Sequence, residues 1–352
     1  MHRLGNKIEL ITRASKDCNG TLEDYETIVD IDWNEFTEEK YLDEIPIKVV
    51  KNNSPNTFIN SSGTLIRVTQ INPWKNTKAV KDAVIKIKSL ESPVKAKQVK
   101  LHKTDEKKDP GITLKITSND EQLDKDISQI KSLSELIKTA FYSFSAIIDE
   151  NGKILYDYTF NRPDYQDIKR QVLSKTEDLI KKDVEWFEEH PLTPENSPGI
   201  FEVNLSAWDL ETATLKIAGL SDYYRNIIKP NSGVRIYRDN FRVWPYGEPD
   251  DDWLNLDLTR LNAPKERTVS RNQVFGVVHI SSIENPELKD QSNREGLIIS
   301  RQYENFYHLV NATLSVFANE RKADKIKIDK ISSSKKVTDI VTESLKKLKT
   351  KV

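Results

Sequence analysis

The stretch 141-FYSFSAIIDENGKILYDYTF-160 contains two runs rich in apolar and aromatic residues, 141–148 and 154–160. The segment that joins them begins with 149-DENG-152, which ends in Asn151-Gly152. Asn-Gly between two such runs is a strong short-range signal for a tight turn. The stretch therefore predicts a β-hairpin in the middle of the chain.

Strands and helices are expected on both sides of this hairpin. The further predicted strands are 7–12, 25–32, 64–69, 111–117, 201–205, 233–238, 241–244 and 273–280. The predicted helices are 74–90, 123–140, 174–189 and a long one from about 303 to beyond 318. These elements mix without the strict alternation of a βαβ protein, so the fold class is α+β rather than a doubly wound parallel sheet.

Composition limits the class of protein. The chain has 352 residues, of which 37% are hydrophobic and 31% charged, as in a globular protein of about two domains. Its net charge of -1 argues against a uniformly basic nucleic-acid binder. It shows neither a long apolar run nor a secretory start, so we expect a cytoplasmic protein without a membrane partner. Cys18 is the single cysteine, which excludes an internal disulfide and makes a zinc site very unfavourable.

Three regions are predicted along the chain. Residues 1–92 hold three predicted strands and one helix, which alone would leave one face of a sheet bare. Residues 93–322 hold the mixed strands and the long helix, after a charged loop at 104–110. Residues 323–352 form a Lys-rich tail, either helical or disordered, and either a partner-dependent extension or the start of a coiled-coil arm.

Two stretches carry a family resemblance. The first is 232-SGVRIYRDNFRV-243, followed by 244-WPYGEP-249. The second is 272-NQVFGVV-278, followed by 284-ENPEL-288 and 290-DQSNREGLI-298. Together they resemble the transducer region of bacterial MORC-like ATPases of the GHKL superfamily, which also contains gyrase B, the ninety-kilodalton heat-shock chaperone, histidine kinases and MutL. The resemblance implies a transducer-like α+β domain, a dimer, and an ATP-driven clamp on DNA.

The N-terminal segment is similar to the end of the same family's ATP-binding domain. The residues that carry this similarity are 3–12, 30–36 and 63–66. The resemblance implies a remnant of an α/β sandwich, with the catalytic Glu, the Mg²⁺-binding Asn and the glycine-rich phosphate lid expected ahead of His2. We therefore expect ATP and Mg²⁺ to be bound only with an ATP-binding half, encoded in the same gene or supplied by a separate chain, and no hydrolysis by this chain alone.

Arg294 is the residue that the resemblance singles out for chemistry. In the heat-shock chaperone the corresponding arginine reaches the γ-phosphate of ATP, and a guanidinium suits this role because it binds two phosphate oxygens. The alternative is an arginine that caps a helix or pairs with Glu295 or Asp290. Lys289 and Arg271 are the next candidates for a phosphate contact.

Gly63 and Thr64 are the candidate nucleotide contacts in the first region. In the family this threonine contacts adenine, often through water, and the glycine lets the backbone approach closely. The alternative is an ordinary strand threonine after a loop glycine.

Arg235, Arg238 and Arg242 alternate with aromatic residues on two predicted strands. Basic groups interleaved with aromatics are typical of a nucleic-acid contact, which gives a second hypothesis: a non-catalytic module that binds nucleic acid or protein. The alternative is a half-buried strand pair with a charged outer face.

The acidic run 250–252 is expected to be a solvated turn.

Overall fold

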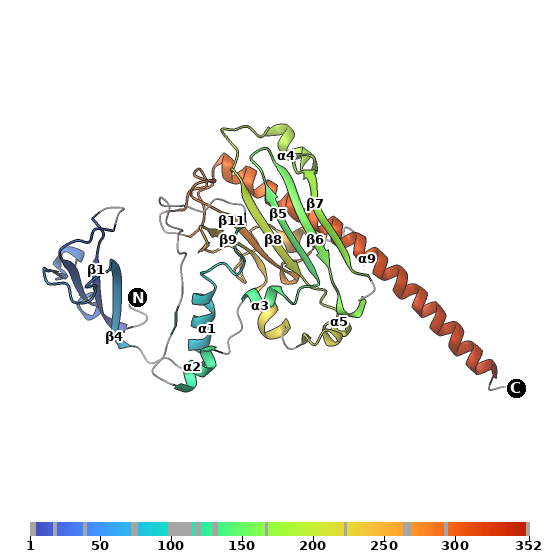
Figure 1. The fold of residues 1–352 in the computed structure, drawn as a ribbon, viewed down its shortest axis with the longest axis horizontal. Helices are drawn as coiled ribbons and strands as arrows, with labels where there is room; N and C mark the ends of the chain where they lie inside the picture. Colours follow the sequence, from blue (N-terminus) through green and yellow to red (C-terminus); the bar gives the residue numbers. More distant parts are fainter. Residues whose placement is uncertain are drawn as a thin grey trace. The chain divides into compact units, whose positions relative to one another are not determined.

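The computed structural model describes residues 5–16, 20–37, 41–71, 77–97, 115–116, 121–128, 133–165, 168–221, 224–262, 269–291 and 295–349. The chain divides into two compact units, Met1–Ala83 and Val84–Val352. Helices and mixed sheets make up an α+β protein, as predicted (Figure 1). No helix in the described part is long and apolar enough to cross a membrane. The strand predicted at 111–117 falls almost wholly outside the described residues.

The first unit contains a four-stranded antiparallel sheet in the order β3-β2-β1-β4. Its strands are β1 (Gly5–Arg13), β2 (Glu26–Asp32), β3 (Lys48–Asn52) and β4 (Gly63–Ile71), with short 3₁₀ turns η1 (Trp33–Glu35) and η2 (Leu42–Glu44). The sequence predicted β1, β2 and β4 but missed β3, an edge strand with two lysines that is exposed over most of its length. Helix α1 (Thr77–Lys88) follows and crosses the boundary between the units.

Both faces of this sheet carry an apolar row, and one face also carries ion pairs. Val49, Val29, Leu10 and Ile66 lie side by side in one row across all four strands. The outer two are 60% and 46% exposed, so this apolar face is open to solvent at both edges. The opposite face has a second apolar row, formed by Val50, Ile28, Ile11 and Leu65. It also carries cross-strand ion pairs, which join Lys7 to Asp32, Lys48 to Asp30, and Arg67 to Glu9.

The second unit is built on a seven-stranded mixed sheet in the order β10-β9-β11-β8-β5-β6-β7. Its strands are β5 (Tyr142–Ile148), β6 (Lys153–Phe160), β7 (Arg170–Asp178), β8 (Phe201–Ala207), β9 (Gly233–Arg238), β10 (Phe241–Val243) and β11 (Val274–Ile280). The pair β9–β11 is parallel and the other pairs are antiparallel. The hairpin predicted at 141–160 is confirmed as β5–β6.

The helices of this unit are short except for the last one. They are α2 (Glu121–Ser128), α3 (Leu133–Ile137), α4 (Val184–Glu189), α5 (Thr212–Ile217), α7 (Lys229–Asn231), α8 (Leu256–Asn262) and α9 (Arg301–Lys349), with short turns η3 (Pro163–Tyr165), η4 (Ile180–Lys182), η5 (Tyr224–Ile228) and η7 (Arg271–Gln273). The single helix predicted at 123–140 corresponds to α2 and α3, with residues 129–132 between them outside the described part.

The helix predicted at 174–189 is wrong over its first part. Residues Arg170–Asp178 form β7, an edge strand that pairs with β6, and a helix forms only at α4. Charged side chains are a common way to protect an edge strand from pairing with other chains. The density of charge in this segment therefore reflects a sheet edge and not the exposed face of a helix.

Helix α9 has 49 residues and includes the Lys-rich segment 323–349 without interruption. Its first half packs on one face of the seven-stranded sheet, and Figure 1 shows it running along the strands and continuing beyond them. Phe306, Leu309, Val310 and Phe317 are fully buried in this contact. Phe317 lies 5.7 Å from the ring of Phe144 on β5. Burial of aromatic and aliphatic side chains supplies the main stabilisation of this layer.

Candidate functional site

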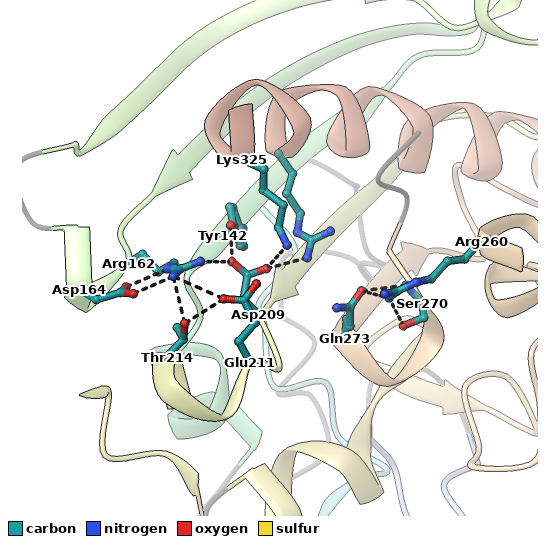
Figure 2. A network of polar contacts seen from close by, with 11 residues as sticks. Tyr142, Arg162, Asp164, Asp209, Glu211, Thr214, Arg260, Ser270, Gln273 and Lys325 are labelled. Carbon is teal, nitrogen blue, oxygen red and sulfur yellow. Dashed lines mark hydrogen bonds and ion pairs between the residues drawn. The ribbon is translucent and has the colours of Figure 1, made fainter. Parts of the chain in front are cut away.

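A buried carboxylate at the end of β8 collects four donors (Figure 2). Oδ2 of Asp209 accepts hydrogen bonds from the Tyr142 hydroxyl and from Arg162 Nη1, each at 2.7 Å. Oδ1 accepts from Arg321 Nη2 at 2.7 Å and lies 2.8 Å from Lys325 Nζ. Asp209 itself is 1% exposed. We call these five residues the Asp209 cluster.

The Asp209 cluster joins three strand ends to α9. Tyr142 begins β5, Arg162 follows β6, and Asp209 follows β8 by two residues. Arg321 and Lys325 lie one turn apart on α9, so both side chains extend from the same face of the helix. The cluster thus connects one helix to strands β5, β6 and β8.

The electrostatics of the cluster fix its protonation. Burial raises the pKa of Asp209, but the positive charges of Arg321 and Lys325 outweigh that effect and hold the pKa well below its usual range. Burial and the neighbouring Asp209 raise the pKa of the Tyr142 hydroxyl, which stays protonated and donates. Neither group is suited to exchange protons near neutral pH. The charged carboxylate and the protonated phenol together hold α9 against the strand ends.

Arg162 is held on its outer side as well. Its Nε and Nη2 donate to the two carboxylate oxygens of Asp164 at 2.8 and 2.7 Å, and Nη2 also donates to Thr214 Oγ1 at 3.0 Å. Such a fork-like contact fixes the plane of the guanidinium.

Figure 2 also shows a separate contact in which Arg260 donates to Ser270 Oγ at 2.8 Å and to Gln273 Oε1 at 2.5 Å, joining α8 to η7.

A second group of charges ties α9 to β6 and β7. The hydroxyls of Tyr156 and Tyr158 donate to Glu320 and Asp324, each at 2.7 Å. Arg170 bonds both carboxylates, with Nη2 2.7 Å from Glu320 and Nε 2.7 Å from Asp324. Glu320 and Asp324 are one helical turn apart, like the basic pair in the Asp209 cluster. We call this group the Arg170 cluster.

The segment 284–298, here called the motif loop, comes directly before α9. Asn285 is fully buried, and its Nδ2 donates to the carbonyl oxygens of Pro198 at 2.7 Å and Ile200 at 3.0 Å. Backbone hydrogen bonds close the loop on itself, from Ile298 N to Lys289 O and from Gln291 N to Gly296 O. The asparagine of the family-like motif therefore has a structural role in this chain.

The predicted phosphate contacts near this loop are placed as follows. Arg294 lies outside the described residues. Lys289 is exposed, and its Nζ lies 3.1 Å from Glu287. Arg271 begins η7, with Nε 3.9 Å from Asp257. Lys289 and Arg271 thus each have a carboxylate close by.

Gly63 and Thr64 are the first two residues of β4 in the first unit. The Thr64 hydroxyl is exposed and lies 3.0 Å from that of Thr12. A Cβ at Gly63 would come within 2.6 Å of the Phe58 ring, so glycine is needed for that ring to pack.

The arginines of β9 and β10 correct the expectation of a basic surface strip. Arg235 and Arg242 are each 3% exposed. Arg235 Nη2 donates to Asn231 Oδ1 at 3.2 Å, and Arg242 pairs with Glu248 at 2.6 Å. Arg238 bonds the carbonyl of Leu288 and Asp290 in the motif loop. Strands covered on both faces bury side chains of either polarity, so alternation alone does not show which arginines reach solvent.

The acidic run 250–252 is also engaged in local structure. Asp252 accepts from the backbone N–H groups of Leu256 and Asp257 at the start of α8, at 3.0 and 2.9 Å. Asp251 accepts from Gly247 N at 2.9 Å. The described residues contain no group of three or more side chains suited to hold a metal ion.

The sequence did not point to the residues of the Asp209 and Arg170 clusters. One signal was available: Glu320, Arg321, Asp324 and Lys325 continue the apolar face of the long predicted helix. Charged residues on such a face have to meet partners of opposite charge. The partners of these four residues come from β6, β7 and the end of β8, which only the tertiary fold brings together. No known family model matches the chain, and comparison with curated proteins finds no match.

Proposed function

We propose that this chain is the transducer portion of a GHKL/MORC-like ATP-binding protein, which converts the nucleotide state of an ATP-binding half into a movement of α9. The observation that carries the proposal is the continuity of the motif loop with the helix. Only Ile299 and Ser300 separate Ile298 from Arg301, where α9 begins. A displacement of the loop is therefore passed directly to the helix.

The way α9 is docked supports this role. Buried ion pairs add little net stability, but they penalise any position of the helix that leaves a charge unpaired. The Asp209 and Arg170 clusters pair four charged residues within two turns of α9, Glu320, Arg321, Asp324 and Lys325, with the sheet. Such pairing disfavours intermediate positions of the helix, as a two-state device requires.

The exposed apolar row Val49-Val29-Leu10-Ile66 of the first unit favours a surface that another protein part covers. Val49 and Ile66, at the two edges of its apolar row, are 60% and 46% exposed. In the proposed function, the ATP-binding half covers this face and supplies the groups that hold ATP and Mg²⁺. Gly63 and Thr64 would contribute the adenine contact, and Arg294 would sense the γ-phosphate. The protein would act in the cytoplasm as a dimer, with DNA as its client.

The alternative, a non-catalytic module that binds nucleic acid, is less favoured. Its main support was the arginine strip, and burial removes Arg235 and Arg242 from the surface. A DNA contact would have to use other cations, such as the lysines of the C-terminal half of α9.

The proposed function is tested by measuring ATP turnover and the position of α9 in the same preparation. Nitroxide labels are placed at Ser333→Cys on α9 and Ser143→Cys on β5, in a Cys18→Ser background. The chain alone should show no turnover and one distance distribution, with or without Mg-ATP.

Joining the chain to an ATP-binding half, as a separate polypeptide or as an N-terminal extension, with a non-hydrolysable ATP analogue should shift the distance, and Arg294→Ala should abolish the shift. Two results contradict the proposal. One is turnover by the chain alone that Arg294→Ala removes, and the other is an unchanged distance in the complex.

A further inference from the structure

Residues 89–97, here called the strap, cross the sheet of the second unit on the face opposite α9. Ser92 N donates to Asn240 O at 3.1 Å. Lys97 N donates to both carboxylate oxygens of Glu202 at 2.9 and 3.0 Å. Glu202 pairs with His279 in the sheet register, and the His279 ring lies 3.4 Å from Ser92 Oγ. The strap continues directly from α1, the helix that crosses the boundary between the two units.

Arg242 on β10 is the junction between the strap and the turn that follows β10. Its backbone N donates to Leu90 O at 2.9 Å, and its Nη1 donates to Ser89 Oγ at 3.1 Å. On the other side, Nη2 donates to the carbonyl of Tyr246 at 3.2 Å and to Glu248 Oε1 at 2.6 Å. The side chain is 3% exposed, so water does not compete effectively for these donors.

Tyr246 continues the connection to the motif loop and to α9. Its hydroxyl accepts from Leu297 N at 3.0 Å, one residue before the loop ends. The same hydroxyl lies 3.5 Å from that of Tyr303, in the first turn of α9. Tyr246 is buried, with 7% of its surface exposed. Its backbone carbonyl accepts a hydrogen bond from Arg242 and its hydroxyl accepts one from Leu297 N, so both the backbone and the side chain of Tyr246 are held in place.

We propose that Ser89, Arg242 and Tyr246 form a relay that couples the strap to the motif loop and to the first turn of α9. The path is contiguous: the strap bonds Arg242, Arg242 bonds Tyr246, and Tyr246 bonds Leu297. Arg242 acts as a positioning residue, because it fixes the turn that carries Tyr246 and touches neither loop nor helix. The relay rests on the proposed function for its purpose, since a transducer needs a path from the nucleotide side to its moving helix.

The surroundings of Arg242 make its position sensitive to each bond. Arg235, a second buried arginine, has its Nη2 on Asn231 and its guanidinium 5.1 Å from the centre of the Phe275 ring. Burial and the charge of Arg235 lower the pKa of Arg242 to about 10, with Glu248 acting in the opposite direction. The Arg242 guanidinium is held by three acceptors, the Ser89 hydroxyl, the Tyr246 carbonyl and Glu248, so each of them contributes to its position. Loss of the Ser89 contact should therefore shift the guanidinium and the Tyr246 carbonyl with it.

The relay is tested by hydrogen exchange and mass spectrometry on the whole chain without nucleotide, so that its failure is distinct from failure of the proposed function. Ser89→Ala should raise exchange about threefold or more in peptides that cover residues 284–303. The matched control is Ser128→Ala. Ser128 Oγ donates to Lys125 O at the end of α2, as Ser89 Oγ donates to Lys86 O after α1, but Ser128 lies on the surface and is not part of the relay.

Coupling between two sites is reciprocal, so a change at Tyr246 should also affect the strap. Tyr246→Phe should raise exchange of the strap amides of Ser92 and Lys97. The control Tyr165→Phe removes another hydroxyl that contacts α9, at Ser332, and should leave the strap unchanged. Unchanged exchange at 284–303 in Ser89→Ala, an equal rise in Ser128→Ala, or an unchanged strap in Tyr246→Phe overturns the relay.

Discussion

Asp209 and Arg321 form a buried ion pair that connects the end of β8 to the middle of α9. Arg321 Nη2 lies 2.7 Å from Asp209 Oδ1, and the two side chains are 1% and 2% exposed. At this depth the cost of removing both charges from water offsets most of their attraction. The value of the pair is therefore positional, because a helix that slides or rotates would leave both charges buried and unpaired.

Removal of the Asp209 charge should be strongly destabilising. Asp209→Asn keeps the size of the side chain but leaves Arg162, Arg321 and Lys325 without their shared partner. Breaking one partner of a buried charge group costs about 3–5 kcal/mol. Urea unfolding followed by circular dichroism measures this loss.

The control for this change is Glu211→Gln. Glu211 is 64% exposed and lies 3.9 Å from Arg162, so solvent screens the pair. We expect a loss below about 1 kcal/mol. Equal losses in the two variants would show that burial does not determine the energetics of the cluster.

Gly199→Ala should disturb the motif loop. Gly199 has φ +83°, and a Cβ there would lie 1.8 Å from the carbonyl oxygen of Glu284. The backbones must separate, which breaks the bonds from Asn285 to the 198–200 segment. The expected loss is about 3 kcal/mol or more, from backbone strain together with the broken bonds. Thermal unfolding gives the value.

Gly219→Ala is the matched control for backbone strain. Gly219 also has a positive φ, +66°, but no atom lies within 4 Å of a Cβ placed there. It should cost only about 1–2 kcal/mol, the strain of a left-handed alanine. If Gly199→Ala cost no more than this, the close approach of the two backbones would not matter for stability.

The sequence predicted the elements whose local pattern is strong. The β5–β6 hairpin, β8, β9, β11 and α9 follow from apolar periodicity and turn residues, and they fix the α+β class. The prediction was wrong where charged residues lie in a strand or in the protein interior. The charged strand β7 was predicted as helix, and Arg235 and Arg242 were expected at the surface.

The candidate site was predictable only in part. The motif loop was identified from residues adjacent in sequence, and its position directly before α9 agrees with the predicted order of elements. The Asp209 cluster joins residues from 142 to 325, and no local pattern relates Asp209 to Arg162 or Arg321. Pairing between such distant residues is decided by the sheet order, which one sequence does not give.

His279 should make stability depend on pH between 6.5 and 4. Burial lowers its pKa from 6.5 to about 4, against the opposing effect of Glu202. In this window the unfolded chain binds a proton that the folded chain does not, so the free energy of unfolding falls as the pH falls. His279→Gln should flatten this part of the stability curve, measured by urea unfolding at several pH values. The two curves should run parallel above pH 7, and an equal slope between 6.5 and 4 would contradict the prediction.

Glu177 should make stability depend on pH in a lower range, between 4.5 and about 2. Burial raises its pKa, but hydrogen bonds from Lys182, Lys175 and Tyr156 outweigh this and lower the pKa from 4.5 to about 2. Because the folded-state pKa is depressed, the stabilisation is present above pH 4.5 and is lost as the pH falls toward 2. Glu177→Gln should therefore lose less stability than the wild type between pH 4.5 and 2.5. Lys182→Met, which removes a cation 2.6 Å from this carboxylate, should weaken the dependence in the same direction. A slope unchanged in both variants would place the acid sensitivity elsewhere, for example at Asp209, whose pKa is also depressed.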